Sequence, residues 1–230
     1  MKAVMTNELK FQFLKQHPLF ENMPLDKIGR ICHLTKYKTI YRGERLGYGS
    51  GSYNKICLLI RGKIKITEVD ENDNDIIKDL LTAPDIFGNF NLNKLLQREE
   101  YAEALTSDTF ICYFSAIDFK KILEENLPLA LNLAQLVNAK LTKLQGRHAD
   151  LIHKDAKSRL IRFIKSWAMS DGSRMGDKIV LNNYLTQGDI AGVIATSRQK
   201  VNSMFNELRD AGLIYYDRDL IELYDPLRRI

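Results

Sequence analysis

The chain contains few cysteines, few prolines and no long apolar run. Its 230 residues include 3 cysteines and 5 prolines. The cysteines lie far apart without CxxC spacing, which argues against a disulfide framework or a cysteine metal site. The apolar runs, such as residues 56–60, are too short to span a bilayer, and the first residues lack the apolar core of a signal peptide. We therefore expect a cytoplasmic protein with no membrane partner.

Several enzyme signatures are also missing. The sequence contains no P-loop, no dinucleotide fingerprint and no nucleophile elbow. Residues 36–116 contain no histidine, which argues against the His-rich metal site of a cupin enzyme. We expect neither enzyme activity nor a bound metal. The formal net charge of +5 permits a polyanionic partner without requiring one.

The periodicity of the sequence changes twice along the chain. Residues 8–34 have helical spacing, whereas residues 36–116 contain short β-rich runs separated by glycine and serine. Two of these runs flank an Arg-Gly-Lys turn within residues 57–67, and another covers residues 109–115. A polar hairpin tip is expected at 69–75. Many short strands punctuated by turns predict a β-sandwich or a jelly-roll barrel.

A long helix is expected next. Leu129, Leu133, Val137, Leu141, Leu144, His148 and Leu151, all apolar except His148, recur there every three or four positions. This stripe could cover the helix's own barrel, or it could form the seam of a dimer. Gly146 interrupts it and costs the helix about 1 kcal/mol.

The C-terminal segment is predicted to begin with a helix capped by Asp155. Residues 170–178 are expected to form a loop, and two short helices follow between about 186 and 211. Gly212 ends the second helix, and residues 213–224 form a β-hairpin with Asp-Arg-Asp at its tip.

The two short helices have the pattern of a helix-turn-helix. Thr186 and Asp189 form one capping box, and Thr196 and Gln199 predict a second one. The small Ala191 allows the two helices to cross closely. The outward face of the second helix is expected to carry Arg198, Gln199, Asn202, Ser203 and Asn206. Arginine and amide side chains suit base reading. A solvated polar face, or a face that binds protein, remains the alternative.

Four segments together resemble the CRP/FNR family of bacterial transcription regulators: residues 58–66, 85–90, 102–114 and 185–214. The resemblance implies an α+β protein in three parts. A cyclic-nucleotide-binding-type β-barrel (jelly roll) with N-terminal helices would cover 1–116. A long dimerisation helix would cover 117–153, and a winged helix-turn-helix domain would cover 154–230. It further implies a homodimer that binds a pseudo-palindromic double-stranded DNA operator and contacts RNA polymerase.

The family's functional positions can be transferred to this chain. Its base-reading positions fall on Arg198, Gln199 and Ser203, beside the outward Asn202. Its phosphate-contacting positions fall on Thr186, Ser197 and Lys200. The family commonly has Glu at position 199 and Arg at position 203, so the DNA sequence that is read should differ. The dimer seam is expected at Leu133, Val137, Leu141, Leu144 and His148.

The cyclic-nucleotide cassette of the family is altered. Its Gly-Glu pair corresponds to Gly88 and Asn89, and its Arg-Ser/Thr pair corresponds to Glu100 and Tyr101. A carboxylate in place of the arginine would repel the cyclic phosphate. A shifted cassette that uses Arg98 is the alternative.

Other effectors of the family would each need their own ligands in the sequence. No cysteine precedes Cys32, which argues against an iron–sulfur cluster. Haem or another small ligand stays open, with His17, His33, His148 and His153 as the candidate axial ligands. We predict no cofactor, and an unknown effector remains compatible with the sequence.

Overall fold

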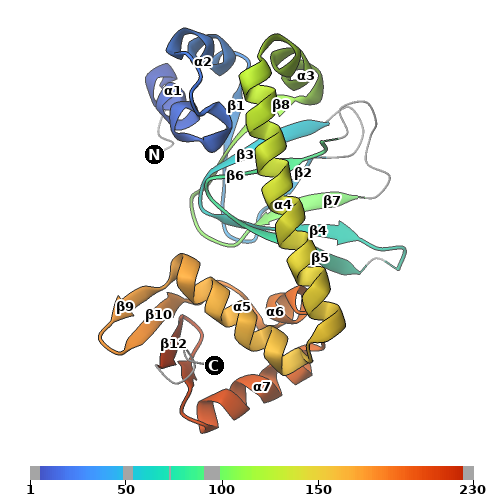
Figure 1. Cartoon of the computed structure of the whole chain (residues 1–230), viewed down its shortest axis with the longest axis vertical. Helices are drawn as coiled ribbons and strands as arrows, with labels where there is room; N and C mark the ends of the chain where they lie inside the picture. Colours follow the sequence, from blue (N-terminus) through green and yellow to red (C-terminus); the bar gives the residue numbers. More distant parts are fainter. Residues whose placement is uncertain (1–5, 49–53, 73, 91–98, 225–230) are drawn as a thin grey trace. The chain divides into compact units, whose positions relative to one another are not determined.

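The computed structural model describes residues 6–48, 54–72, 74–90 and 99–224. Contacts within the chain divide it into two compact units, Met1–Thr142 and Lys143–Ile230. The division falls inside the long helix α4 (Leu127–His153), shown in yellow-green to yellow in Figure 1. This two-way division does not test the predicted boundaries at residues 116 and 153, which stay predictions.

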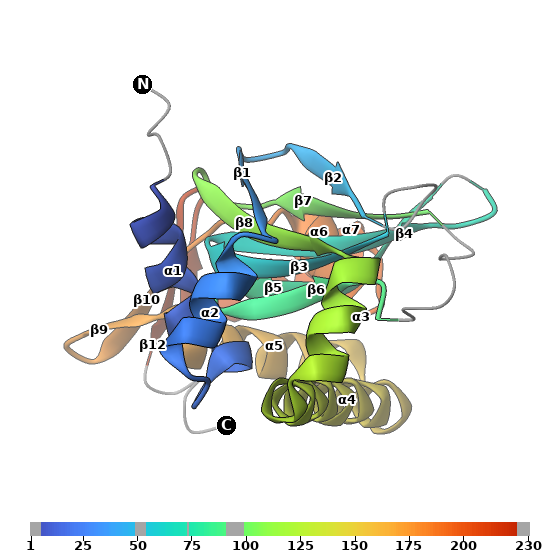
Figure 2. The ribbon, with the colours of Figure 1, turned by 90° about the horizontal axis from the view of Figure 1, so that it is seen from above.

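From residue 6 on, the described part of the first unit starts with three short helices. They are α1 (Asn7–Gln16), the 3-10 helix η1 (Pro18–Phe20) and α2 (Leu25–Cys32), and they confirm the helical pattern of residues 8–34. Figure 2 shows α1 and α2 side by side at one end of the sheets. Their apolar side chains are buried, Leu14 and Leu19 completely. These helices therefore close one side of the core.

Eight antiparallel strands follow among the described residues of 36–116, and they confirm the β-rich segment. One sheet has the order β1-β8-β3-β6 and the other has the order β2-β7-β4-β5. Their bounds are β1 (Lys36–Ile40), β2 (Arg45–Gly47), β3 (Lys55–Arg61), β4 (Lys63–Val69), β5 (Asp75–Thr82), β6 (Asp85–Gly88), β7 (Glu100–Ala104) and β8 (Thr109–Ser115). The turn at Gly62 passes the chain from one sheet to the other, so β3 and β4 do not pair with each other. The predicted tip at 69–75 joins β4 and β5, which do pair.

Strand β3 explains why the sequence contains an uninterrupted apolar run. Ile56 and Leu58 belong to the core cluster that also contains residues of α1, α2 and α3. Cys57 and Leu59 belong to the cluster between the two sheets. Successive side chains point to opposite faces of a strand, so both faces of β3 are buried. The sheet that contains β3 is therefore the middle layer of this unit.

Helix α3 (Ala116–Glu125) and the first half of α4 cover the outer side of this layer. Leu129 is fully buried there. The Asn132 amide donates hydrogen bonds to the carbonyls of Leu19 and Glu21, and the Lys140 ammonium lies 2.6 Å from a carboxylate oxygen of Asp85. One face of α4 is thus occupied by its own barrel.

The second unit contains helices on a small antiparallel sheet. Its elements are α5 (Ala156–Asp171), β9 (Ser173–Met175), β10 (Lys178–Asn182), α6 (Gln187–Val193), α7 (Arg198–Asp210), β11 (Ile214–Tyr216) and β12 (Leu220–Tyr224), with sheet order β11-β12-β10-β9. Asp155 caps α5 as predicted, by accepting a hydrogen bond from the Ser158 N–H. The prediction of a loop over 170–178 was wrong in part, because β9 forms there and pairs with β10 around a turn at Gly176 with φ of +64°.

The arrangement confirms the predicted fold class: a double-layered β unit, a long helix and a helix-turn-helix followed by a hairpin. Among the described residues, no helix combines the length and the apolar character needed to cross a membrane.

Candidate nucleic-acid interface

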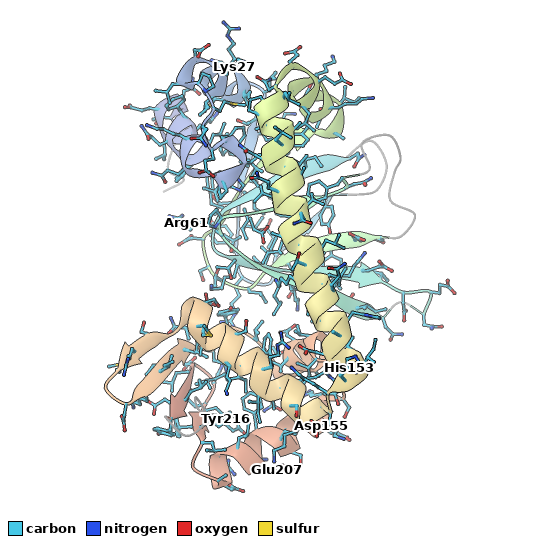
Figure 3. The ribbon with its side chains drawn as sticks, viewed as in Figure 1. Lys27, Arg61, His153, Asp155, Glu207 and Tyr216 are labelled. Carbon is cyan, nitrogen blue, oxygen red and sulfur yellow. The ribbon has the colours of Figure 1, made fainter. Side chains whose placement is uncertain are left out.

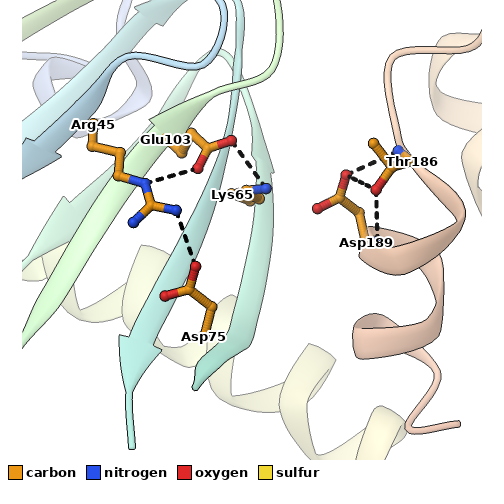
Figure 4. A network of polar contacts seen from close by, with 6 residues as sticks. All are labelled: Arg45, Lys65, Asp75, Glu103, Thr186 and Asp189. Carbon is orange, nitrogen blue, oxygen red and sulfur yellow. Dashed lines mark hydrogen bonds and ion pairs between the residues drawn. The ribbon is translucent and has the colours of Figure 1, made fainter. Parts of the chain in front are cut away.

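The first helix of the pair begins at the predicted capping box. The Thr186 hydroxyl accepts a hydrogen bond from the Asp189 N–H, and the Asp189 carboxylate accepts one from the Thr186 N–H at 2.9 Å. Figure 4 shows these contacts beside α6. The Thr186 hydroxyl also donates to Asp189 at 2.7 Å. Its hydrogen is therefore used inside the cap, and at this position a phosphate would meet backbone N–H groups rather than that hydroxyl.

The second helix begins one residue later than predicted. Ser197 is the N-cap of α7, and its hydroxyl accepts from the Lys200 N–H at 3.2 Å. Thr196 instead donates its N–H to the Ala191 carbonyl at 3.0 Å and belongs to the end of α6. The predicted second capping box of Thr196 and Gln199 was therefore wrong.

The inner face of α7 is apolar, as predicted. Val201, Phe205 and Leu208 are buried, and Met204 joins them. Ala191 of α6 is also buried, which allows the close crossing of the two helices. This packing fixes the direction of the opposite face of α7.

That opposite face is exposed and polar. Arg198, Gln199, Asn202 and Ser203 are all exposed. Sequence reasoning missed Gln187 at the start of α6, whose amide donates to the Asn202 side-chain oxygen at 3.3 Å. The spacing of 15 residues between the two gives no sequence signal for this contact. The structure thus adds a side chain from α6 beside the predicted base-reading residues.

The hairpin after α7 is anchored to it. The Tyr216 hydroxyl donates to the Asn206 side chain at 3.0 Å, and the rings of Phe205 and Tyr216 meet edge to face at 4.9 Å. At the tip, Asp217 accepts hydrogen bonds from the N–H groups of Asp219 and Leu220, and these bonds lower the pKa of the Asp217 carboxyl. Figure 3 labels Tyr216 on the hairpin and Glu207 on α7.

The exposed face of α4 carries a stripe that is apolar except for one histidine. Its members lie at alternating steps of three and four: Ala134, Val137, Leu141, Leu144, His148 and Leu151, all exposed. Leu133, which we predicted in the seam, instead packs partly buried against the core of its own barrel, as does Leu136. Leu129, Leu133 and Val137 are spaced four residues apart, so each lies further around a helix that has 3.6 residues per turn. Leu133 therefore lies nearer to the buried side that carries Leu129 than Val137 does.

The cassette positions lie in the β unit. Gly88 has φ of +126°, and a Cβ there would collide with the Lys55 backbone carbonyl. Asn89 is buried, and its N–H donates to the same carbonyl at 3.3 Å. Both residues therefore serve the close packing of the end of β6 on β3.

Glu100 takes part in an ionic cluster on the inner face of its sheet. It pairs in register with Glu68, and the neighbouring pair Ile66 and Ala102 lies in the core between the sheets. The Tyr48 hydroxyl donates to Glu100 at 2.9 Å. The Lys78 ammonium contacts Glu100 and lies 2.8 Å from Glu68. Burial and the carboxylate raise the pKa of Tyr48, so the phenol stays neutral.

Tyr101 alternates with Glu100 and faces the other way. The Arg45 guanidinium lies over its ring at 4.3 Å. Figure 4 shows that Arg45 also bridges Asp75 and Glu103. Burial raises the pKa of Tyr101 to about 12. The two adjacent cassette positions therefore take part in two separate networks. Arg98 lies outside the described residues.

The histidines differ in their availability as ligands. His17 is buried, and its Nδ1 accepts from the Leu19 N–H while its Nε2 lies 3.1 Å from the Asp85 carbonyl. Both ring nitrogens of His17 are thus engaged. The side chains of His33, His148 and His153 are exposed. In the part of the chain that the structure describes, no group of three His, Cys, Asp or Glu side chains could hold a metal ion.

Comparison with known proteins gives a consistent result. Residues 158–228 match the family model of the Crp-like helix-turn-helix domain. The chain is 24% identical over 187 residues to the global nitrogen regulator of Synechococcus elongatus, and the match covers 81% of this chain and 84% of that protein.

Solved structures are similar over most of the chain. A mutant of CooA from Carboxydothermus hydrogenoformans has a TM-score of 0.70 at 22% identity, covering 87% of this chain and 88% of that one. A transcriptional regulator of the CRP/FNR family from Thermus thermophilus has a TM-score of 0.66 at 20% identity, with coverages of 84% and 97%. At such identities the likeness shows the fold.

Proposed function

Because the chain belongs to the CRP/FNR family of transcription regulators, we propose that it binds a two-fold symmetric DNA operator as a homodimer, with α7 of each chain in a major groove. The observation that carries this proposal is the outward face of α7. Arg198, Gln199, Asn202 and Ser203 are exposed there on a helix whose other face is buried. RNA polymerase is the second partner that we expect.

Arg198 is the residue to which we assign most of the base reading. It occupies the first position of α7 after the Ser197 cap, so its side chain extends from the end of the helix that enters the groove. A guanidinium can donate two hydrogen bonds to one guanine. Gln199 and Asn202 offer amides suited to adenine, and Lys200 offers an ammonium for a phosphate.

The apolar stripe on α4 supports the homodimer. Its spacing of alternating three and four residues is that of a coiled-coil seam, and it extends from Ala134 to Leu151. The barrel already covers the face that carries Leu129 and Asn132. A second copy of the same helix is complementary to this stripe because two-fold symmetry places the same residues on both sides.

We further propose that the β unit does not respond to cyclic AMP. A cyclic phosphate placed at Glu100 would meet the carboxylates of Glu68 and Glu100, with Lys78 already held between them. The charge at the site therefore disfavours an anion. An effector of another class, or no effector, is consistent with the same residues. Calorimetry with cyclic AMP and cyclic GMP tests this; micromolar binding of either would refute it.

The experiment that tests DNA reading begins with selection of bound sites from random DNA. We expect a palindrome whose half-sites lie about one helical turn apart. Replacing Arg198 with alanine should weaken binding to that operator by about 1–3 kcal/mol and relax the base preference at one position in each half-site. Arg209→Ala is the matched control, because Arg209 lies at the far end of α7 and pairs with Asp210.

The outcomes separate base reading from general attraction. Arg209→Ala should leave the selected sequence unchanged. If Arg198→Ala weakens binding to the operator and to random DNA by the same factor, Arg198 contacts only phosphates. Failure to select any sequence, with binding insensitive to salt, would contradict the DNA-binding proposal itself.

A further inference from the structure

The turn between α6 and α7 ends α6 in an unusual way. Ala195 has φ of +52°, and the next residue, Thr196, donates its N–H back to the Ala191 carbonyl. This is the hydrogen bond of a Schellman motif, in which the left-handed residue is usually glycine. Helix α7 ends in the same motif with Gly212 at φ of +67°. An alanine in that conformation is strained by about 1–2 kcal/mol.

A single arginine binds the carbonyls at this strained turn. The Arg159 Nε donates to the Ile194 carbonyl at 2.8 Å, and Nη2 donates to the Ala195 carbonyl at 3.1 Å. Arg147, near the end of α4, adds a longer contact of 3.4 Å to the Val193 carbonyl. The carbonyl end of a helix carries partial negative charge, so two guanidinium groups there are electrostatically favourable.

The same guanidinium also binds the junction between α4 and α5. The Arg159 Nη1 donates to the Lys154 carbonyl at 2.7 Å, and Lys154 directly follows the last residue of α4. One planar group with a fixed set of donors therefore connects the end of α4 to the helix-turn-helix turn. A lysine has one nitrogen at its tip and could not reproduce the three directions.

Two ion pairs of α5 each reach only one neighbouring helix, α4 or α7. Arg162 pairs with Asp150 of α4 at 2.6 Å, and Lys157 pairs with Glu207 of α7 at 2.8 Å. Both pairs are well exposed on at least one side, where ion pairs contribute little. Figure 3 labels Asp155 at the start of α5 and Glu207 on α7. Among the described residues of α5, Arg159 is thus the one that hydrogen-bonds both to the residue after α4 and to the turn between α6 and α7.

We propose that Arg159 is a positioning residue that sets the direction of α7 relative to the end of α4, and thereby the half-site spacing that the dimer accepts. The proposal rests on the proposed DNA-binding function. Two α7 helices held rigidly against the ends of paired α4 helices would fit one operator spacing. Loosening the turn from α4 lets each α7 rotate, so that altered spacings are tolerated.

The test compares Arg159→Lys and Arg159→Gln with the wild-type protein on three operators. One operator has the selected spacing, and the others have the centre shortened or lengthened by a single base pair. In the wild type we expect a clear preference for the selected spacing. In both variants that preference should fall by about tenfold, the factor that corresponds to about 1.4 kcal/mol. Arg162→Gln, which breaks only the pair with Asp150, is the matched control and should retain the preference.

A double variant separates positioning from stability. Ala195→Gly removes the backbone strain, so Arg159→Lys combined with Ala195→Gly should regain thermal stability but not the spacing preference. If the double variant regains both, Arg159 only stabilises the turn and the proposal is wrong. An unchanged preference in folded Arg159→Gln also overturns it. If the wild type selects no operator at all, the proposed function fails first, and the two failures are thereby distinguished.

Discussion

Leu144 offers a direct test of the seam on α4, because its contribution can be worked out from its exposure. The residue is 57% exposed in the single chain. Complete burial of a leucine side chain contributes about 1.5–3 kcal/mol, so dimer formation can still gain just over half of that from each Leu144. The two leucines together would stabilise the dimer by about 2–3 kcal/mol. Since alanine retains the Cβ, we expect Leu144→Ala to weaken the dimer by about 2 kcal/mol, which is about 30-fold in the dissociation constant.

Sedimentation equilibrium over a range of protein concentrations measures this constant directly. Thr142→Ala is the matched control. Thr142 is exposed on the same helix but lies outside the stripe, and its hydroxyl donates to the Asn138 carbonyl of its own helix. The control should leave the dissociation constant unchanged within about twofold.

The reasoning is refuted if Leu144→Ala and Thr142→Ala give the same dissociation constant. It is also refuted if the wild-type chain remains monomeric at micromolar concentration with and without operator DNA. A loss of thermal stability in Leu144→Ala that does not depend on protein concentration would mean that Leu144 packs within its own chain.

Three further predictions concern the stability of the single chain. Ala195→Gly should raise the free energy of unfolding by about 0.5–1 kcal/mol in urea titrations, after the greater chain entropy of glycine is subtracted; a destabilised variant would contradict the strain at this turn. Burial lowers the pKa of His17 from its ordinary value of 6.5, against an opposing effect of Asp85. The stabilisation that neutral His17 gives to the folded chain should therefore be complete above pH 6.5. The free energy of unfolding should decrease as the pH falls from 6.5 toward the lowered pKa. In His17→Gln the free energy of unfolding should change less with pH over this range. An unchanged pH dependence would exclude His17 as the cause of the decrease. Burial also raises the pKa values of Cys57 and of Cys112, the latter to about 12, so neither thiol should react with a disulfide reagent at pH 8 until the chain unfolds; rapid labelling of either would contradict its burial.

The sequence was informative where structure depends on nearby residues. The Thr186 cap, the buried stripe of α7 and the end of that helix at Gly212 all follow from residues within four or five positions of one another. The start of α7 was missed by one residue because Thr196 and Ser197 are both suitable caps. The left-handed Ala195, which an alanine in the sequence does not signal, decides between them.

Long-range contacts were beyond the reach of the sequence. Leu133 and Val137 have the same character and spacing, and only the barrel packed against α4 distinguishes them. Arg159 gives no local signal, because the carbonyls at the helix-turn-helix turn lie 35 and 36 residues further along the chain. Gln187 and Asn202 likewise meet only after α6 and α7 have crossed.

An ionic cluster in the β unit also limits how a cyclic-phosphate site could arise in this chain. The cluster consists of Glu68, Glu100, Lys78 and neutral Tyr48. Its formal charges sum to −1, and they lie on strands β4, β7 and β5 with Tyr48 following β2. Replacing Glu100 with arginine would bring the sum to +1 but would place the new cation beside Lys78 and leave Tyr48 without its acceptor. Acquisition of a cyclic-phosphate site would therefore require coordinated substitutions on several strands. On the proposal that this unit does not respond to cyclic AMP, a single substitution at Glu100 would therefore not be enough to create such a site.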